Sequence, residues 1–274
     1  MSEKKQGVFK SFFGGIGQST FFILSGISRL FGLFGSVVKI TFSGFVDHKA
    51  IRGEYLARQM FLSGVDSLGI ICLVGAAVGM VLALQAAYQL KQFGAVLYTG
   101  SLVSVSICRE LGPLVAAIVL SGRIGARMAS ELGSMAVNEE VDALKTMGLS
   151  PIRILVVPRV LAMIVMLPCL TVICDVMGMI GGFLIGVYGV GINPYLYLAK
   201  NFDALVLKDI YSGLVKSGIF AMLIALVSCH QGLSVEGGAE GVGKATTQAV
   251  VISIVLIIVV DCLATAVMFY ALPT

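Results

Sequence analysis

Residues 109–158 decide the fold, and they read RELGPLVAAIVLSGRIGARMASELGSMAVNEEVDALKTMGLSPIRILVVP. The stretch begins with a charged pair, Arg109 and Glu110, inside an otherwise apolar run. It leaves that run at Arg123 and continues into a densely charged segment, which is compatible with a helix that ends at Gly148. The pattern therefore predicts a charge pair at membrane depth that is joined, within one short stretch of chain, to a charged helix outside the membrane.

The composition of the whole chain supports the membrane assignment. Of the 274 residues, 58% are hydrophobic and 12% are charged, whereas soluble domains carry about a quarter charged residues. A chain of this length has room for one bundle of five or six spans and little else. We therefore expect an all-α integral membrane protein.

Five runs with few or no charges are long enough to cross a bilayer, which takes about 20 residues in a helix. The expected spans cover residues 67–90, 96–122, 160–187, 212–233 and 248–270. Eight of the 19 Lys and Arg residues precede Leu62, and five more lie within 123–159. By the positive-inside rule, both of these segments are expected in the cytoplasm, which places the carboxyl end outside.

The amino end is expected to be a distinct part of the chain. Residues 1–61 form a basic cytoplasmic end, in which the Phe- and Gly-rich segment 11–46 is typical of a helix lying in the inner interface. A true span over residues 11–29 stays open as an alternative. Residues 62–274 then form the five-span domain, with the charged segment 123–159 on its cytoplasmic side.

Several kinds of site are not indicated by the sequence. The six cysteines lie in apolar segments without a CxxC pair, so we expect no metal site. Residues 238–245 partly match a phosphate-binding loop, but Ala245 stands where a hydroxyl would hold magnesium, and no strand precedes it. We expect no cofactor on this chain, and a membrane surface rather than nucleic acid beside its basic amino end.

A set of four ionisable residues is expected to share one polar layer: Arg109, Glu110, Lys216 and Asp261. At a helix rise of ~1.5 Å per residue, Arg109 and Asp261 lie roughly 20 Å, and Lys216 roughly 25 Å, above the inner surface. A charge at the bilayer centre costs about 2.5–3.5 kcal/mol on an insertion scale, so each needs a partner or a wet cavity. Two interpretations stay open: charge pairs that only keep the helices in register, or a polar ring around a ligand headgroup.

Neighbouring residues add two further expectations for this layer. Ile219, Phe220 and Leu223 follow Lys216 by three, four and seven residues, so an apolar face with one charge near its end is expected, which suits a lipid. Arg109 is expected to hold Glu110 or Asp261 with bidentate geometry. Asp175, inside the third span, is interpreted as a helix-packing residue and left out of the site.

The charged segment 130–147 is the second candidate site. Three of its four acidic residues, Glu139, Glu140 and Asp142, are called the coupling acids below. Its apolar residues are spaced for one broad face of a helix: Leu132, Met135, Val141 and Leu144. The segment is either a solvated helix that merely links two spans or a docking helix whose charged face meets a partner protein.

The run RELGPLVAAIVLSGRIGARMASELGSM, followed by NEEVDALKTMG, resembles the MlaE/YrbE permeases, the membrane subunits of ABC systems that work with MCE proteins. Four more runs continue the resemblance in the same order: PIRILVVPRVLA, GLVKSGIFA, GVGKATTQAVV and VVDCLATAVMF. Together they cover at least residues 60–270. Motifs in this order, with this spacing, are highly specific for the family.

The resemblance implies a homodimer of half-transporters in the bacterial inner membrane, amino end cytoplasmic and carboxyl end periplasmic. Two cytoplasmic ATPase subunits would bind ATP and Mg, a hexameric MCE ring would sit on the outer face, and phospholipid would occupy a cavity between protomers. Residues 139–148 would belong to the helix that couples to the ATPase, and the four residues of the polar layer would lie near the lipid. The chain itself would be a transport subunit and not an enzyme. A non-transporting membrane scaffold for an MCE-like partner is the alternative function, and a small-solute importer permease is a third.

Overall fold

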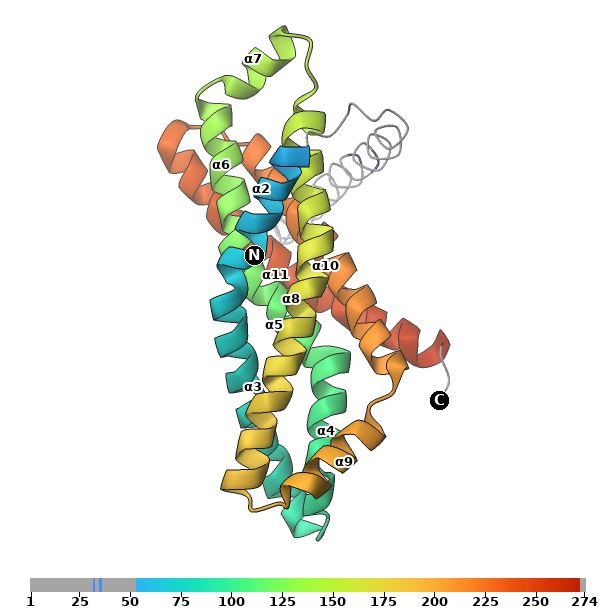
Figure 1. The fold of residues 1–274 in the computed structure, drawn as a ribbon. Coiled ribbons are helices and arrows are strands. Elements are labelled where there is room, and N and C mark those ends of the chain that lie inside the picture. Colours follow the sequence, from blue (N-terminus) through green and yellow to red (C-terminus); the bar gives the residue numbers. More distant parts are fainter. Residues whose placement is uncertain (1–31, 33–34, 36–52, 272–274) are drawn as a thin grey trace, which may run out of the picture.

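The computed structural model describes Gly32, Gly35 and residues 53–271 (Figure 1). No strand occurs among these residues, and five helical segments are long and apolar enough to cross a membrane: Gly53–Gln92, Val96–Val137, Ile152–Gly189, Leu207–Leu233 and Gly238–Met268. The predicted all-α fold with five spans is therefore confirmed. The helix expected within residues 11–46, and the alternative span over 11–29, lie outside the described residues apart from the two glycines.

The first span combines α2 (Gly53–Ser63), the short turn η1 (Val65–Ser67) and α3 (Leu68–Gln92). Both helices pack against α8 (Val157–Leu184), which is the longest part of the third span. The third span also includes a π-helical turn at each end, η5 (Ile152–Val156) and η6 (Ile185–Gly189). Helix α2 thus extends the first span beyond the run expected from hydrophobicity alone.

The second span, Val96–Val137, is one continuous rod. It consists of η2 (Val96–Tyr98), α4 (Thr99–Ser106), η3 (Ile107–Leu111), α5 (Gly112–Leu120), η4 (Ser121–Gly125) and α6 (Ala126–Val137). η3 and η4 are turns of π-helix, a local widening that is frequent at functional sites. The first of them carries Arg109 and Glu110, so the charge pair lies at an irregular turn of the rod.

The rod ends before Glu139, which adopts a φ of 59°, a left-handed conformation that is uncommon for a residue with a side chain. The short helix α7 (Glu140–Thr146) follows. The helix expected over residues 130–147 is therefore two helices, because this left-handed residue interrupts the path between α6 and α7. The remaining elements are α9 (Pro194–Ala204), α10 (Leu207–Leu233) and α11 (Gly238–Ala271).

Glycines allow α3 and α8 to pack backbone against backbone. A Cβ atom at Gly79 would lie 1.9 Å from the carbonyl oxygen of Gly178, and one at Gly75 would lie 2.8 Å from that of Cys174. No real side chain fits at such distances, so both positions require glycine for this approach. Gly75 and Gly79 therefore lie at the close contact with α8, whereas Gly69 of the same helix faces open space.

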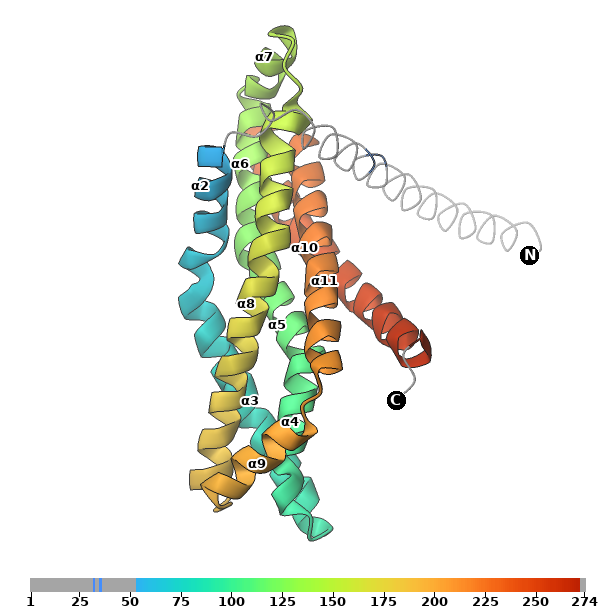
Figure 2. The ribbon, with the colours of Figure 1, turned by 45° about the vertical axis from the view of Figure 1, so that its right-hand side comes forward.

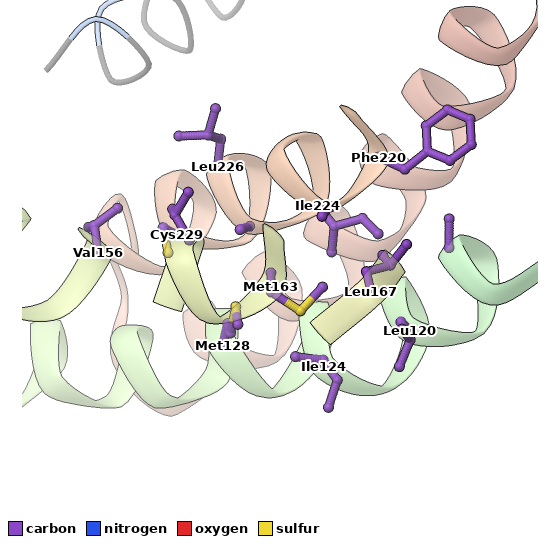
Figure 3. Packing of buried hydrophobic residues seen from close by; sticks show 14 of the residues in the cluster. Leu120, Ile124, Met128, Val156, Met163, Leu167, Phe220, Ile224, Leu226 and Cys229 are labelled. Carbon is purple, nitrogen blue, oxygen red and sulfur yellow. The ribbon is translucent and has the colours of Figure 1, made fainter. Parts of the chain in front are cut away.

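The main hydrophobic core forms where the rod, α8 and α10 meet (Figure 3). Leu120 and Ile124 of the rod, Met163 and Leu167 of α8, and Ile224 of α10 are each at most 2% exposed. From this core, α6 continues to pack on α10 and α11. The rod is therefore in contact with the two helices that carry Lys216 and Asp261.

The two ends of the bundle are clearly distinct (Figures 1 and 2). Helix α7 lies at one end and α9 lies across the opposite end, while α11 runs obliquely away from the other spans toward its carboxyl end. Six exposed side chains form an apolar stripe along α11: Val251, Val255, Ile258, Val259, Leu263 and Val267. This stripe is covered by no other helix of the described chain.

Candidate functional site

Lys216 is the centre of the polar layer and is fully buried within α10. Its ammonium donates hydrogen bonds to Glu110 of η3 and to the hydroxyl of Thr265 on α11, the latter at 2.7 Å. Asp261, one turn before Thr265, places Oδ1 3.0 Å from the same nitrogen as an ion pair. We call Glu110, Lys216, Asp261 and Thr265 the lysine cluster; it joins the second, fourth and fifth spans.

Thr265 links α11 to Glu110 of the rod. Its hydroxyl oxygen accepts from Lys216 and lies 3.1 Å from Glu110 Oε1 and 2.8 Å from the Asp261 carbonyl oxygen. A hydroxyl has one proton, so it donates to only one of these oxygens at a time. The threonine can therefore exchange its donated hydrogen bond between the rod and its own helix without leaving the ammonium.

The lysine cluster contains one cation and two carboxylates. The Lys216 side chain is 0% exposed, that of Asp261 16% and that of Glu110 31%, so the carboxylates rather than the ammonium face outward. An anionic group that approaches the lysine cluster therefore meets its carboxylates before Lys216. It reaches Lys216 only when one of the two ion pairs opens.

Arg109 does not join the cluster. Its guanidinium lies 3.9 Å from Asp209 near the start of α10, and its side chain remains 39% exposed. The expectation that it holds Glu110 or Asp261 is therefore wrong. The physical reason is that successive residues of a helix point in different directions, so Arg109 and Glu110 cannot both face Lys216.

The structure adds two residues that the sequence reading missed. Thr265 follows Asp261 by four residues and so shares its helix face, a spacing that could have identified it. Asp209 precedes Lys216 by seven residues on α10, again about two helical turns along one face. Both are short polar side chains beside an intramembrane charge, which is the signal to search for.

The single apolar face expected beyond Lys216 is divided between the core and the outside of the chain, and its role as a lipid surface stays a prediction. Phe220 is fully buried in the core, whereas Ile219 is 40% exposed, so the two point to different environments. An open apolar recess of about 350 Å³ lies elsewhere, along α3 and beside η3. Its lining consists of Ala77, Val78, Val81, Leu82, Gln85 and Leu111. Leu111 directly follows Glu110, so the same turn η3 contributes one residue to the recess and one to the lysine cluster, in different directions.

Asp175 of α8 lies against Gly112 of the rod. It is 7% exposed, and a Cβ atom at Gly112 would lie 1.6 Å from its Oδ1. Glycine at position 112 therefore makes room for this carboxyl group. Its Oδ1 has no hydrogen-bond partner among the described residues, and its interpretation as a helix-packing residue stays a prediction.

The coupling acids lie at the tip of the bundle, on or next to α7 (Figure 2). All three are exposed, and Asp142 forms a 2.7 Å ion pair with Lys145 on the same surface. Val141 is buried and Leu144 packs against the core, so α7 has an apolar side toward the bundle and a charged side away from it. The expected amphipathic character of this segment is confirmed.

The sequence also matches known proteins. Residues 56–267 match the family described as Permease MlaE. The chain belongs to the MlaE permease family. Over 214 residues it is 42% identical to a probable ABC transporter permease protein of Rickettsia typhi, covering 78% of this chain and 83% of the relative.

Two further relatives extend the range of the family. The intermembrane phospholipid transport system permease protein MlaE of Haemophilus influenzae is 33% identical over 233 residues, which is 84% of this chain and 89% of that protein. The chloroplastic protein TRIGALACTOSYLDIACYLGLYCEROL 1 of Arabidopsis thaliana is 38% identical over 206 residues, which is 74% of this chain and 58% of that protein. The resemblance found in the sequence is confirmed, and this MlaE-family chain is a multi-span transport subunit of the ABC permease type.

Proposed function

We propose that this MlaE-family permease moves a two-chain lipid between the bacterial inner membrane and an MCE-protein partner on its outer face. A separate cytoplasmic ATPase supplies the energy. The observation that carries the proposal is the lysine cluster, which gathers charged groups from three spans at η3, the turn whose Leu111 also lines an open apolar recess. Such a combination offers charged groups for a headgroup and an apolar wall for an acyl chain within one region of the second span.

The names of two relatives support a lipid with two tails rather than one fixed headgroup. The Haemophilus influenzae protein is named for phospholipid transport, and the Arabidopsis thaliana protein is named for trigalactosyldiacylglycerol. These lipids share a diacylglycerol body and differ in the headgroup. We infer that the apolar recess recognises the shared part, and that phospholipid is the substrate of the present chain.

Exposed charges at membrane depth support a homodimer. The side chains of Arg109 and Glu110 are 39% and 31% exposed in the single chain, and a charge facing lipid is costly. A second copy that covers this side would enclose the charges in a shared, water-filled cavity. The uncovered apolar stripe of α11 supplies the kind of surface that such a copy can bury.

We infer that the two cations of the polar layer, Arg109 and Lys216, have different roles. Arg109 is accessible, so an anionic headgroup meets it first and competes with Asp209 for its guanidinium. Lys216 is inaccessible until an ion pair with Glu110 or Asp261 opens. The lysine cluster therefore acts as a gate that a bound headgroup, or a movement of the rod, can release.

We infer from α7 that a separate ATPase supplies the energy. Among the described residues, the one ion pair on the exposed charged side of α7 is the local pair of Lys145 with Asp142. A charged helix at the cytoplasmic tip is suited to a groove of a partner ATPase, and family membership supports this assignment. The coupling acids would then form its contact surface, with ATP and Mg bound by the partner.

Two measurements test the proposal. Native mass spectrometry of the extracted complex should detect an ABC ATPase, two copies of the permease and bound diacyl lipid. In proteoliposomes, Arg109→Ala should reduce ATP-dependent transfer of a fluorescent phospholipid, while Arg123→Ala, an exposed arginine of the same rod, should not. Absence of both ATPase and lipid from the wild-type complex would refute the transporter and favour the scaffold. Equal transfer by both variants would refute the role of Arg109.

A further inference from the structure

A buried arginine ties together the two helices that flank α7. Arg159 of α8 is 1% exposed; its Nη2 donates to Glu131 Oε2 of α6 at 3.2 Å, and its Nη1 donates to the Leu155 carbonyl of η5 at 2.7 Å. Glu131 is held a second time by Arg127, one turn earlier on α6, at 2.8 Å. We call Arg127, Glu131 and Arg159 the arginine clamp.

The arginine clamp joins the two ends of the chain segment that carries α7. Glu131 and Arg159 are 28 residues apart in sequence, and the chain between them runs out to the exposed tip and back. Helix α7 packs on α6, so a force applied at the tip enters the bundle through α6. The bond between Glu131 and Arg159 then shares that force with α8.

Stability alone does not account for a charged residue at position 159. A buried ion pair is often no more stable than apolar residues of similar volume, because both charges lose their hydration. The Nε atom of Arg159 also lacks a hydrogen-bond partner among the described residues, which adds a desolvation cost. Unlike an apolar contact, however, a guanidinium–carboxylate bond fixes the direction and spacing of the two helices.

The rod supplies the connection from the clamp to the lysine cluster. Glu131 lies in α6 and Glu110 in η3 of the same continuous helical span, with the π turn η4 between them. Without the clamp, α6 could bend at η4 and move away from α8. With it, α6 and α8 move as one body, and α6 also presses on α10 and α11, which carry Lys216 and Asp261.

We propose that Arg159 is a positioning residue that transmits motion of the α7 segment to the lysine cluster. The proposal rests on the proposed docking of an ATPase at α7. Its specific content is that loss of Arg159 uncouples ATP hydrolysis from lipid movement while the complex stays assembled. A residue that only stabilised the fold would lower assembly and both activities together.

Arg159→Met is the informative variant, because Glu131 keeps its bond to Arg127 and is not left unpaired. Arg127→Met is the matched control, since it removes an arginine within α6 but leaves the bond between α6 and α8. The readout is phospholipid transferred per ATP hydrolysed by the complex in proteoliposomes. Arg159→Met should lower this ratio about tenfold with hydrolysis retained, and Arg127→Met should change it less than about twofold.

A normal ratio in assembled Arg159→Met would overturn the proposal. If that variant does not assemble, Glu131→Leu combined with Arg159→Met replaces the clamp by an apolar contact. A low ratio in the assembled double variant supports the proposal, and a normal ratio overturns it. If neither variant assembles, Arg159 is needed only for folding or assembly, and the proposal is also overturned. A wild-type complex that contains no ATPase would instead refute the proposed function.

Discussion

Lys216→Met and Asp261→Asn should differ greatly in their effect on stability, although both change the same ion pair. Loss of the ammonium leaves Glu110 and Asp261 facing each other without a cation, and breaking a buried pair in this way costs about 3–5 kcal/mol. Asp261→Asn leaves Lys216 bound to Glu110 and Thr265, a balanced set, so its cost should approach that of one hydrogen bond, about 1 kcal/mol. The asymmetry follows from one cation being shared by two carboxylates.

Thermal unfolding of the purified permease in nanodiscs measures this difference. For a chain of this length, 1 kcal/mol corresponds to about 2–4 °C in Tm, so Lys216→Met should lower Tm by about 6–20 °C and Asp261→Asn by at most about 4 °C. Lys216→Met combined with Glu110→Gln removes the repulsion between the two carboxylates and should recover part of the loss, because Asp261 still lacks a cation. Equal decreases for the two single variants, or a larger one for Asp261→Asn, would show that Glu110 is not the principal partner of Lys216.

Three other outcomes are expected. In a cysteine-free background, a cysteine at Ser150 should be shielded from an impermeant thiol reagent added outside, while one at Asp203, an exposed residue of α9, should react. The reverse labelling would invert the topology. Replacing all three coupling acids by Lys should leave the permease in the membrane but detach the ATPase or abolish transport-stimulated hydrolysis, and unchanged assembly and hydrolysis would leave α7 a plain linker. Gly79→Ala should lower the free energy of unfolding by about 1–3 kcal/mol or more, because its Cβ would meet the Gly178 backbone. Gly69→Ala, in open space on the same helix, should be near neutral in the same unfolding assay.

The five spans could be predicted because an uncharged run of sufficient length has few alternatives in a membrane. The same reasoning places Glu110, Lys216 and Asp261 at one depth, and the structure brings these three together. Depth along a helix axis is set by residue number, which the sequence supplies directly. The direction in which a side chain points around the helix axis is a separate quantity. Depth alone therefore places Arg109 in the cluster, whereas its side chain points to Asp209.

Two features near α7 could not be predicted, for different reasons. Arg159 ends a charged segment between two spans, where an arginine is ordinarily solvated. Only the structure shows that it is buried and bonded to Glu131 of α6. The break at Glu139 has no signal in the sequence, because a left-handed residue is usually Gly or Asn and this one is neither.

The π turn η3 makes the lysine cluster sensitive to the number of residues in the second span. A π turn closes its hydrogen bond one residue later than an α turn does, so it accommodates one extra residue within the helix. Deletion of one residue within Ile107–Leu111 would therefore leave a regular α-helix whose two flanking parts keep nearly their present directions. Only the residues of the turn itself would change direction, and Glu110 would no longer be held against Lys216. The length of this short turn is therefore as much a determinant of the site as the identity of any residue in it.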